Sequence, residues 1–213
     1  MTTTHREVEV KFLVRDTTVL RAVAQLRSLG PFTLMRRHSE RQRNTYVDTD
    51  DARLHRARAV LKVRKIGSGI SLTFKQAKRM QRGFGVRREI TSRLSQRRLD
   101  LVWQAQLHPA PMRAARRILG AAPLRPRLCL LTHRRRLTLA YQRQRIAVDV
   151  DRVTCAPLHG PAVTWCEVEL EALHATPRIF EGVVNDFTRR FGSRLRRSAR
   201  SKYTIGLALT RKG

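Results

Sequence analysis

The sequence is poor in acidic residues and in cysteine. Its 213 residues contain 16 Asp and Glu against 45 Lys and Arg, so the formal net charge is +29. A charge of this sign and size attracts polyanions, among them nucleic acid, polyphosphate, phosphorylated metabolites and acidic membrane surfaces. An arginine-rich proteome produces the same bias, so the charge alone does not choose between these partners and a merely basic surface.

The cysteines and the apolar segments exclude several classes of protein. Cys129, Cys155 and Cys166 form no CxxC pair, which argues against a disulfide framework and a structural zinc site. No apolar run reaches roughly 18 residues, so we expect no membrane span. The N-terminal segment lacks the apolar core of a signal peptide, and a cytoplasmic location is the default expectation. Hydrophobic residues make up 41% of the chain, enough for a folded core.

Near the N-terminus, residues 6–12 alternate between charged and apolar side chains. Glu7, Glu9 and Lys11 lie two residues apart, with valines between them. A β-strand has a side-chain period of two, so the three charges share one face and the valines take the other. Such a charged face either decorates an outer surface or lines a water-filled cavity that holds cations and anions.

Alternation of this kind recurs along the chain and predicts eight strands. We place them at residues 5–14, 41–49, 59–65, 70–75, 86–94, 127–139, 145–153 and 163–173. Gly67-Ser68-Gly69 predicts a hairpin turn, and the short connections favour a mainly antiparallel sheet. Helical periodicity predicts helices at residues 18–29, 54–58 and 179–191 and two more within 95–119, while residues 78–85 read as a basic loop. Trp103 and Trp165 are expected to anchor the core.

Charges of both signs collect on one face of most of these strands. The cationic members are Lys11, Lys62, Arg64, Lys75, Arg87, Arg134 and Arg136, and the acidic members are Glu7, Glu9, Glu89, Asp149, Glu167 and Glu169. The outer faces of a sandwich could carry the same pattern. Its repetition, with helices available to cover the apolar faces, favours a closed barrel. The predicted fold class is α+β: one domain over residues 1–213, an eight-stranded antiparallel β-barrel, or tunnel, with helices packed on the outside.

A charged lumen of this kind suggests phosphate chemistry. Cationic side chains that point inward can share the oxygens of a linear polyphosphate. Carboxylates beside them would cancel that attraction unless they bind divalent cations, and oxygen ligands of this type suit Mg²⁺ or Mn²⁺. The metal would then act as a Lewis acid and generate a nucleophilic hydroxide.

The motifs, taken in order, resemble those of the CYTH superfamily, the triphosphate tunnel metalloenzymes. Glu7-x-Glu9-x-Lys11 resembles the ExExK strand of that family. Further resemblances follow in the order Leu61-Lys62-Val63-Arg64, Leu72-Thr73-Phe74-Lys75, Arg87-x-Glu89, Thr132-His133-Arg134, Asp149, Glu167-x-Glu169 and Ser201-Lys202-Tyr203. The likeness covers roughly residues 5–207. ExExK alone is a weak motif, whereas the ordered set is specific.

The resemblance implies metal-dependent hydrolysis of a triphosphate, with inorganic triphosphate as the first expected substrate. It implies metal ligation by Glu7, Glu9, Asp149, Glu167 and Glu169, and phosphate binding by Lys11, Lys62, Arg64, Lys75, Arg87, Arg134, Arg136 and Lys202. Glu7, Glu9, Lys11 and Glu89 are the implied catalytic residues. The chain departs from the family pattern twice: Lys62 replaces a more usual arginine, and Thr91 stands where a second glutamate is common. Glu171 continues the Glu167 phase and is expected at the rim of the tunnel.

Several alternatives stay open on the sequence. Thiamine triphosphatase and adenylate cyclase activities occur on the same fold. A polyphosphate-binding module without turnover is a second class, and a basic RNA-binding barrel is a third, which would leave the inward carboxylates unexplained. The expected partners are thus a triphosphate or polyphosphate and not a membrane, with nucleic acid as a minor alternative through the basic surface; a homodimer is left open.

Overall fold

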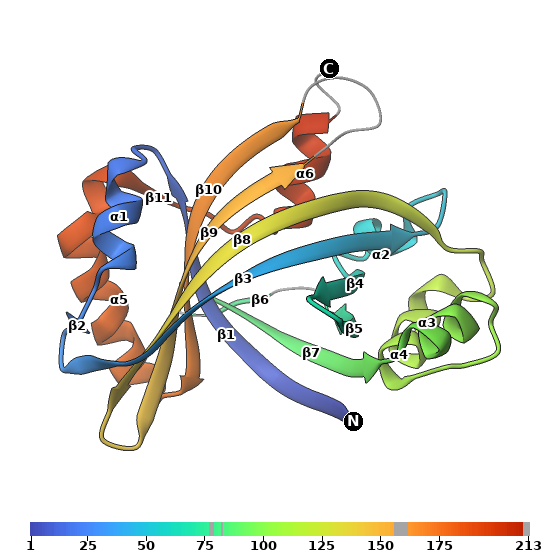
Figure 1. The fold of residues 1–213 in the computed structure, drawn as a ribbon, viewed down its shortest axis with the longest axis horizontal. Coiled ribbons are helices and arrows are strands. Elements are labelled where there is room, and N and C mark those ends of the chain that lie inside the picture. Colours follow the sequence, from blue (N-terminus) through green and yellow to red (C-terminus); the bar gives the residue numbers. More distant parts are fainter. Residues whose placement is uncertain (77–78, 82, 156–161, 211–213) are drawn as a thin grey trace.

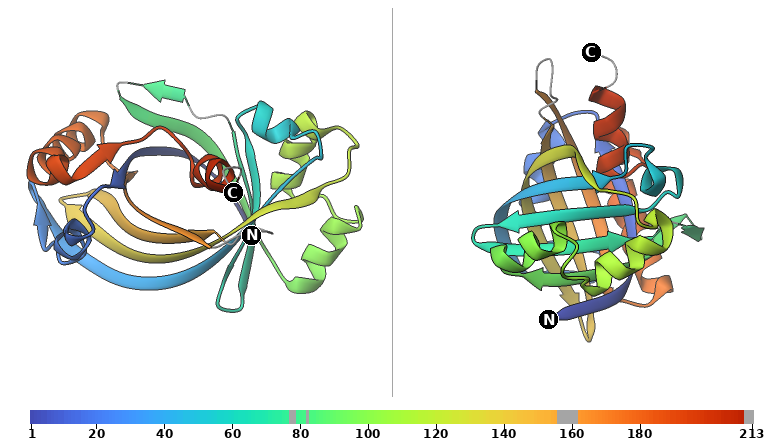
Figure 2. Two further views of the ribbon diagram at one scale, coloured as in Figure 1. Left: turned by 90° about the horizontal axis from the view of Figure 1, so that it is seen from above. Right: turned by 90° about the vertical axis from the view of Figure 1, so that its right-hand side faces the viewer.

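The structure is a computed structural model that describes residues 1–76, 79–81, 83–155 and 162–210 (Figure 1). Its main feature is a closed antiparallel ring of strands. The eight ring strands are, in spatial order, β1 (Thr2–Val14), β10 (Val163–His174), β9 (Gln144–Cys155), β8 (Arg125–Tyr141), β3 (Phe32–Asp48), β4 (Val60–Ile66), β5 (Gly69–Lys75) and β7 (Phe84–Leu94). The ring closes because β7 also pairs with β1, from Thr2 opposite Ser92 to Glu9 opposite Gly85. The predicted eight-stranded antiparallel tunnel is confirmed, although its cross-section is not evenly round (Figure 2).

The remaining elements lie outside the ring strands or at their ends. Three short strands extend the sheet: β2 (Ser28–Leu29) pairs with β3, β6 (Arg79–Gln81) with β7, and β11 (Leu195–Arg197) with β1. The helices among the described residues are α1 (Thr18–Ala24), α2 (Arg53–Arg56), α3 (Gln96–Trp103), α4 (Ala110–Leu119), α5 (Pro177–Phe191) and α6 (Lys202–Thr210), with a 3-10 turn at Gly192–Arg194. No helix formed by the described residues combines the length and the apolarity needed to cross a membrane.

The apolar faces of the strands point outward and are buried by helices. At one end, α1 and α5 pack on β1, β8, β9 and β10, and the rings of Phe12 and Phe187 lie 5.3 Å apart. At the other end, α3 and α4 pack on β4, β5 and β7 around Phe74, Met112 and Leu119. Because the helices of both main cores lie outside the ring (Figure 2), most of the inner faces of the strands are left to polar side chains.

A third and smaller apolar cluster lies where α6 meets the ring. Tyr46 of β3 stacks on Tyr203 of α6 with ring centroids 5.0 Å apart, and Leu128 and Leu130 of β8 complete the contact. Both tyrosines therefore pack against each other in the wall. The cluster fixes the first turn of α6, which begins at Lys202, against the ring.

Several boundaries differ from those predicted. The helix expected over residues 18–29 ends at Ala24, because residues 28–29 pair with β3 instead. The strand expected over residues 41–49 begins at Phe32, where pairing with β8 overrides a segment with no apolar alternation. In the expected basic loop, residues 79–81 form β6, while residues 78 and 82 lie outside the described residues. Trp103 is 42% exposed and does not anchor the core.

Candidate active site

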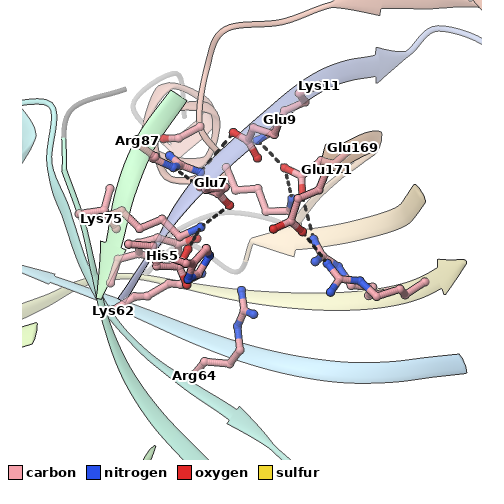
Figure 3. Close-up of a pocket in the computed structure, with 17 residues that line it drawn as sticks. His5, Glu7, Glu9, Lys11, Lys62, Arg64, Lys75, Arg87, Glu169 and Glu171 are labelled. Carbon is pink, nitrogen blue, oxygen red and sulfur yellow. Dashed lines mark hydrogen bonds and ion pairs between the residues drawn. The ribbon is translucent and has the colours of Figure 1, made fainter. Parts of the chain in front are cut away.

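The lumen of the ring contains a cavity of about 330 Å³ lined almost entirely by charged side chains (Figure 3). Seven of the eight ring strands contribute to its wall, together with the start of α6. The lining cations are Lys11, Lys62, Arg64, Lys75, Arg87, Arg134, Arg136 and Lys202, and the lining acids are Glu7, Glu9, Glu89, Glu169 and Glu171. The period-two alternation of the strands thus brings seven of the predicted phosphate-binding residues into one cavity, and the start of α6 adds the eighth, Lys202.

On the β1–β7–β5 side, two cations hold three carboxylates. Lys75 Nζ lies 2.8 Å from Glu7 Oε1 and 2.6 Å from Glu89 Oε2. Arg87 donates to the other oxygen of Glu7 and lies 3.2 Å from Glu9 Oε1. Burial raises the pKa of Glu89, but Lys75 outweighs it and lowers that pKa to about 2. Glu7, also buried, has its pKa held well below the usual range by Lys75 and Arg87.

On the β10–β9–β8 side, a second network joins Lys11, Lys202 and two arginines to acids. Lys11 Nζ lies 2.8 Å from Glu169 Oε1, and Lys202 Nζ lies 3.0 Å from the same oxygen. Burial lowers the pKa of both lysines, but the carboxylates around them outweigh it and raise that pKa. The two lysines are therefore held as cations beside Glu169.

The two arginines of β8 continue this network. Arg134 binds Asp151 through two nitrogens, at 2.8 and 2.6 Å, and also contacts Glu169 at 2.8 Å. Arg136 binds Asp149 in the same forked way, at 2.6 Å for both contacts, and reaches Glu171 Oε2 at 3.1 Å. Such forks fix the guanidinium planes within the lumen.

Lys62 and Arg64 of β4 form the part of the wall that carries no carboxylate. Neither forms an ion pair with any acid of the described residues; Arg64 Nε donates to Asn44 Oδ1 at 2.8 Å, and Lys62 lies 6.0 Å from the centre of the Tyr46 ring. Burial, together with the charges of Arg64 and Lys75, lowers the pKa of Lys62 well below its usual value. An anion placed here would relieve the repulsion between the two cations.

The lumen contains equal numbers of cations and carboxylates when the carboxylates behind the cavity wall are included. Asp149, Asp151 and Glu167 lie behind the cavity wall and pair with its cations, which brings the acids to the same number as the cations. A phosphate chain entering this space would meet carboxylates as well as cations. The arrangement therefore attracts a phosphate chain best when positive charge enters with it.

The donor set of the lumen fits a hard divalent cation. Oxygens of Asp151, Glu167 and Glu169 all lie within 4.8 Å of one another. Glu9 of β1 faces them closely enough for its charge and that of Glu169 to repel. Carboxylate oxygens in a buried group are the ligands that Mg²⁺ and Mn²⁺ prefer. Glu7 lies apart from this group, held by Lys75 and Arg87.

Three features of the site differ from or add to the expectations. Asp151, which shares the phase of Asp149, was not among the predicted ligands, yet it anchors Arg134 and Lys202. Glu171 was expected at the rim; it lines the cavity as the most exposed of the lining acids, at 18%, and burial raises its pKa to about 7 against the opposing effect of Arg136. Thr91 donates to Glu89 at 3.1 Å, so the position where a second glutamate is common carries a neutral side chain.

Comparison with known proteins agrees with this geometry. The family model of the CYTH domain matches residues 5–204, whereas no curated protein matches the chain. The fold is similar to that of HpAC1 from Hippeastrum, a candidate adenylyl cyclase described as having a dominant triphosphatase activity, with a TM-score of 0.68, 17% identity and 95% of each chain covered.

Two further solved structures are similar over nearly their whole length. A candidate adenylate cyclase from Bacillus halodurans has a TM-score of 0.64 and 22% identity, with 93% of this chain and 96% of that chain covered. The PH1819 protein of Pyrococcus horikoshii has a TM-score of 0.58 and 16% identity, with 95% of this chain and 98% of that chain covered. At these identities the likeness shows a common fold.

Proposed function

The chain belongs to the CYTH domain family, and on this premise we propose that it hydrolyses a triphosphate in its lumen with the help of a divalent metal ion. One observation carries the proposal: a closed ring encloses eight cations and a matching set of carboxylates in one cavity. Phosphoryl transfer needs little covalent chemistry from the protein and depends on positioned positive charge. The triphosphatase activity described for HpAC1, which shares the fold, supports the same reading.

The cations of the lumen divide into three functional sets under this proposal. Lys62 and Arg64, which have no acidic partner among the described residues, take up the first phosphate oxygens. Lys75, Arg87, Arg134, Arg136 and Lys202 turn from their carboxylates toward the chain as it enters. Lys11 stays between Glu167 and Glu169 and orients them. The geometry thus binds the phosphate chain along the wall and neutralises charge that develops on the leaving group.

The carboxylates form the complementary set. Glu169, backed by Glu167 and Asp151 and faced by Glu9, would hold the metal ion. Mg²⁺ or Mn²⁺ bound there would polarise phosphate oxygens and a water molecule. Glu7 and Glu89 hold Lys75 in place, and Asp149 holds Arg136. We therefore assign Glu7, Glu89 and Asp149 to positioning rather than to direct contact with the reacting atoms.

The size of the cavity favours inorganic triphosphate as the substrate. Its volume of about 330 Å³ is at the lower end of the range for small-molecule sites. Its lining offers almost no apolar surface for an organic group besides Tyr46 and Val60. A nucleoside or thiamine moiety would have to remain outside the charged space.

The direct test is phosphate release from a panel of inorganic triphosphate, ATP and thiamine triphosphate with Mg²⁺, Mn²⁺ or a chelator. We expect inorganic triphosphate to be hydrolysed fastest and the chelator to abolish the reaction. Glu169→Gln, which keeps the shape of the side chain, should lower the rate by about a hundredfold or more. The matched control is Glu181→Gln on the exposed face of α5, which should keep the rate. Equal rates for both variants would contradict the proposal.

A polyphosphate-binding module without turnover is the second candidate function. Thr91 favours it, because the neutral hydroxyl beside Glu89 removes one carboxylate from the family pattern. Tight and salt-sensitive binding of inorganic polyphosphate, with no phosphate released under any metal, would support this reading. Thr91→Glu would then be the variant to examine for a gain of hydrolysis.

A further inference from the structure

The outer face of β3, β8 and β9 carries a second group of cations, which the lumen does not use. Strand register places Arg41 of β3 opposite His133 of β8, which in turn lies opposite Arg152 of β9. In the next row, Lys65 of β4 lies opposite Arg43 of β3. These side chains are exposed because they alternate with the lumen-facing residues of the same strands. Arg135, between two lumen arginines, points outward in the same way.

The cations of this face have no acidic partner among the described residues, since Asp151, which lines the third of its hollows from beneath, is paired with Arg134 and Lys202. Among the described residues, none of the cations forms an ion pair, and Lys65 only donates to Gln96 at 3.0 Å. Like charges directly opposite each other on a sheet are destabilising. Figure 2 shows the face bare between α1 at one end and α3 with α4 at the other, so no described helix covers it. A polyanion in solution would supply the missing charge.

Three hollows run side by side along this face and share their lining residues. The first, of about 720 Å³, lies between α3, α4 and the strands and contains Trp103, Arg43 and Lys65. The second, of about 470 Å³, shares Arg43 and Lys65 and adds Arg41 and Arg152. The third, of about 240 Å³, shares Arg152 and adds cations of α1 and β8. We call Arg21, Arg41, Arg43, Lys65, Arg135 and Arg152 the outer basic track.

Two exposed apolar side chains indicate which kind of polyanion the outer basic track would bind. Trp103 is 42% exposed at one end of the track, and Leu131 is 53% exposed in its middle, next to Arg43. An inorganic polyphosphate has no group that would contact an indole or an isobutyl side chain. Bases of a single-stranded nucleic acid stack on aromatic rings while cations follow the backbone. We propose that the outer basic track binds single-stranded nucleic acid, separately from the lumen.

The test uses a fluorescent 5′-hydroxyl oligouridylate of about 15 nucleotides, within the site sizes of single-strand-binding folds. This probe lacks the triphosphate that the lumen would bind. The variant R41Q/R43Q/R152Q should weaken binding about tenfold or more, and should reduce the slope of log K against log salt by about 2, since each phosphate contact contributes about 0.7. Trp103→Leu should weaken binding about fivefold or more, and Trp103→Phe should restore part of it.

The matched control is R6Q/R88Q/R178Q, which removes the same charge from exposed positions outside the track. It should change the affinity for the oligouridylate little. Both triple variants should keep the wild-type rate of triphosphate hydrolysis, so the failure of this proposal can be told apart from the failure of the proposed lumen activity. Equal weakening by the two triple variants would overturn the proposal, because it would mean attraction by net charge alone. Displacement of the probe by inorganic triphosphate, or binding of long-chain polyphosphate but not of the probe, would overturn it as well.

Discussion

Lys62 is a lumen residue whose charge depends on what else is bound. It is buried beside Arg64 and Lys75 and has no carboxylate partner among the described residues. Its pKa is therefore lowered well below the usual lysine value, whereas the ion-paired Lys11 and Lys202 have raised pKa values. A phosphate oxygen beside Lys62 would favour the ammonium form and raise its pKa, so binding would take up a proton.

We predict that the affinity for triphosphate falls as the pH rises through the lowered pKa of Lys62. Above that pKa the free protein holds a neutral amine, and binding must also protonate it. Lys62→Arg keeps the charge at every accessible pH, because a guanidinium does not deprotonate, and should extend tight binding to higher pH. Isothermal titration calorimetry with a non-hydrolysable triphosphate analogue, from neutral to alkaline pH, measures both curves.

The control for this prediction is Lys65→Arg, on the opposite face of β4, which should leave the pH dependence of the wild type unchanged. Coincident curves for the wild type and Lys62→Arg would mean that another group titrates in the lumen.

The sequence predicts which residues face the lumen, but not which of them are neutralised there. Period two places Lys62 and Lys75 on inward faces equally well. Only the strand order shows that Lys75 of β5 reaches across β7 to pair with Glu7 of β1. Lys62 forms no ion pair with an acid of the described residues. The depth of Glu171 likewise depends on the strand pairing, since β1 pairs with it at Glu9.

At the scale of elements, α6 decides the shape of one end of the lumen. Its first residue is Lys202, which reaches Asp151 and Glu169, and its body packs on β8. Gly206 lies so close to β8 that an added Cβ would stand 2.6 Å from Leu128 Cδ2 and 3.3 Å from Leu130 Cδ2. A helix that is apolar on all sides gives no periodic signal, which is why the sequence indicated an apolar stretch but not this helix.

We predict that Gly206→Ala lowers the free energy of unfolding by about 1–3 kcal/mol, because the added methyl group overlaps the buried Leu128 side chain and crowds that of Leu130, so the contact between α6 and β8 must repack. The same change should weaken triphosphate binding, since Lys202 moves with the helix. Urea unfolding and calorimetric titration measure the two effects.

Gly182→Ala in α5 is the matched control, because nothing lies within 4 Å of its added Cβ. There, replacing glycine in a helix should raise the free energy of unfolding by about 0.5–1 kcal/mol. The two variants should change the free energy of unfolding in opposite directions. A higher free energy of unfolding for Gly206→Ala would show that α6 does not dock as described.

The elements whose bounds the sequence predicted wrongly are those in which pairing between strands overrides the local sequence pattern. The first half of β3, for which the sequence predicted no element, pairs with β8 from Thr33 opposite Ala140 onward. A long partner strand supplies its backbone hydrogen bonds, so its side chains need not alternate. The strands with an apolar outer face and a charged inner face, such as β1, β5 and β7, were placed within a few residues.

At the scale of the whole molecule, the charge is distributed unevenly. The chain carries a formal net charge of +29, but the lumen contains cations and carboxylates in equal number. The excess charge therefore lies on the outside of the ring, where the outer basic track is one part of it. Apart from Lys62 and Arg64, the lumen cations are paired with carboxylates of the described residues, so that part of the interior gains little from either an anion or a cation alone.

This balance predicts that a divalent metal and a triphosphate stabilise the protein cooperatively. A triphosphate alone must compete with Glu169 for Arg134 and Lys202, and a metal alone must compete with those two cations for Glu169. When both bind, the metal takes Glu169 and frees its cations for the triphosphate, and the triphosphate takes those cations and frees Glu169 for the metal. With a non-hydrolysable triphosphate analogue and Mg²⁺, we expect a coupling free energy of about 1–3 kcal/mol. This should raise the melting temperature by about 2–10 °C beyond the sum of the two separate shifts.

Differential scanning calorimetry with each ligand alone and with both measures this coupling, and linkage requires the same factor from titrations in either order. Glu169→Gln should remove most of the coupling while leaving a shift from the analogue alone, because Lys62 and Arg64 still bind it. Glu181→Gln on α5 should keep the full coupling. Strictly additive shifts in the wild type would mean that metal and phosphate bind in different places, and that the carboxylates of the lumen serve only to hold its cations.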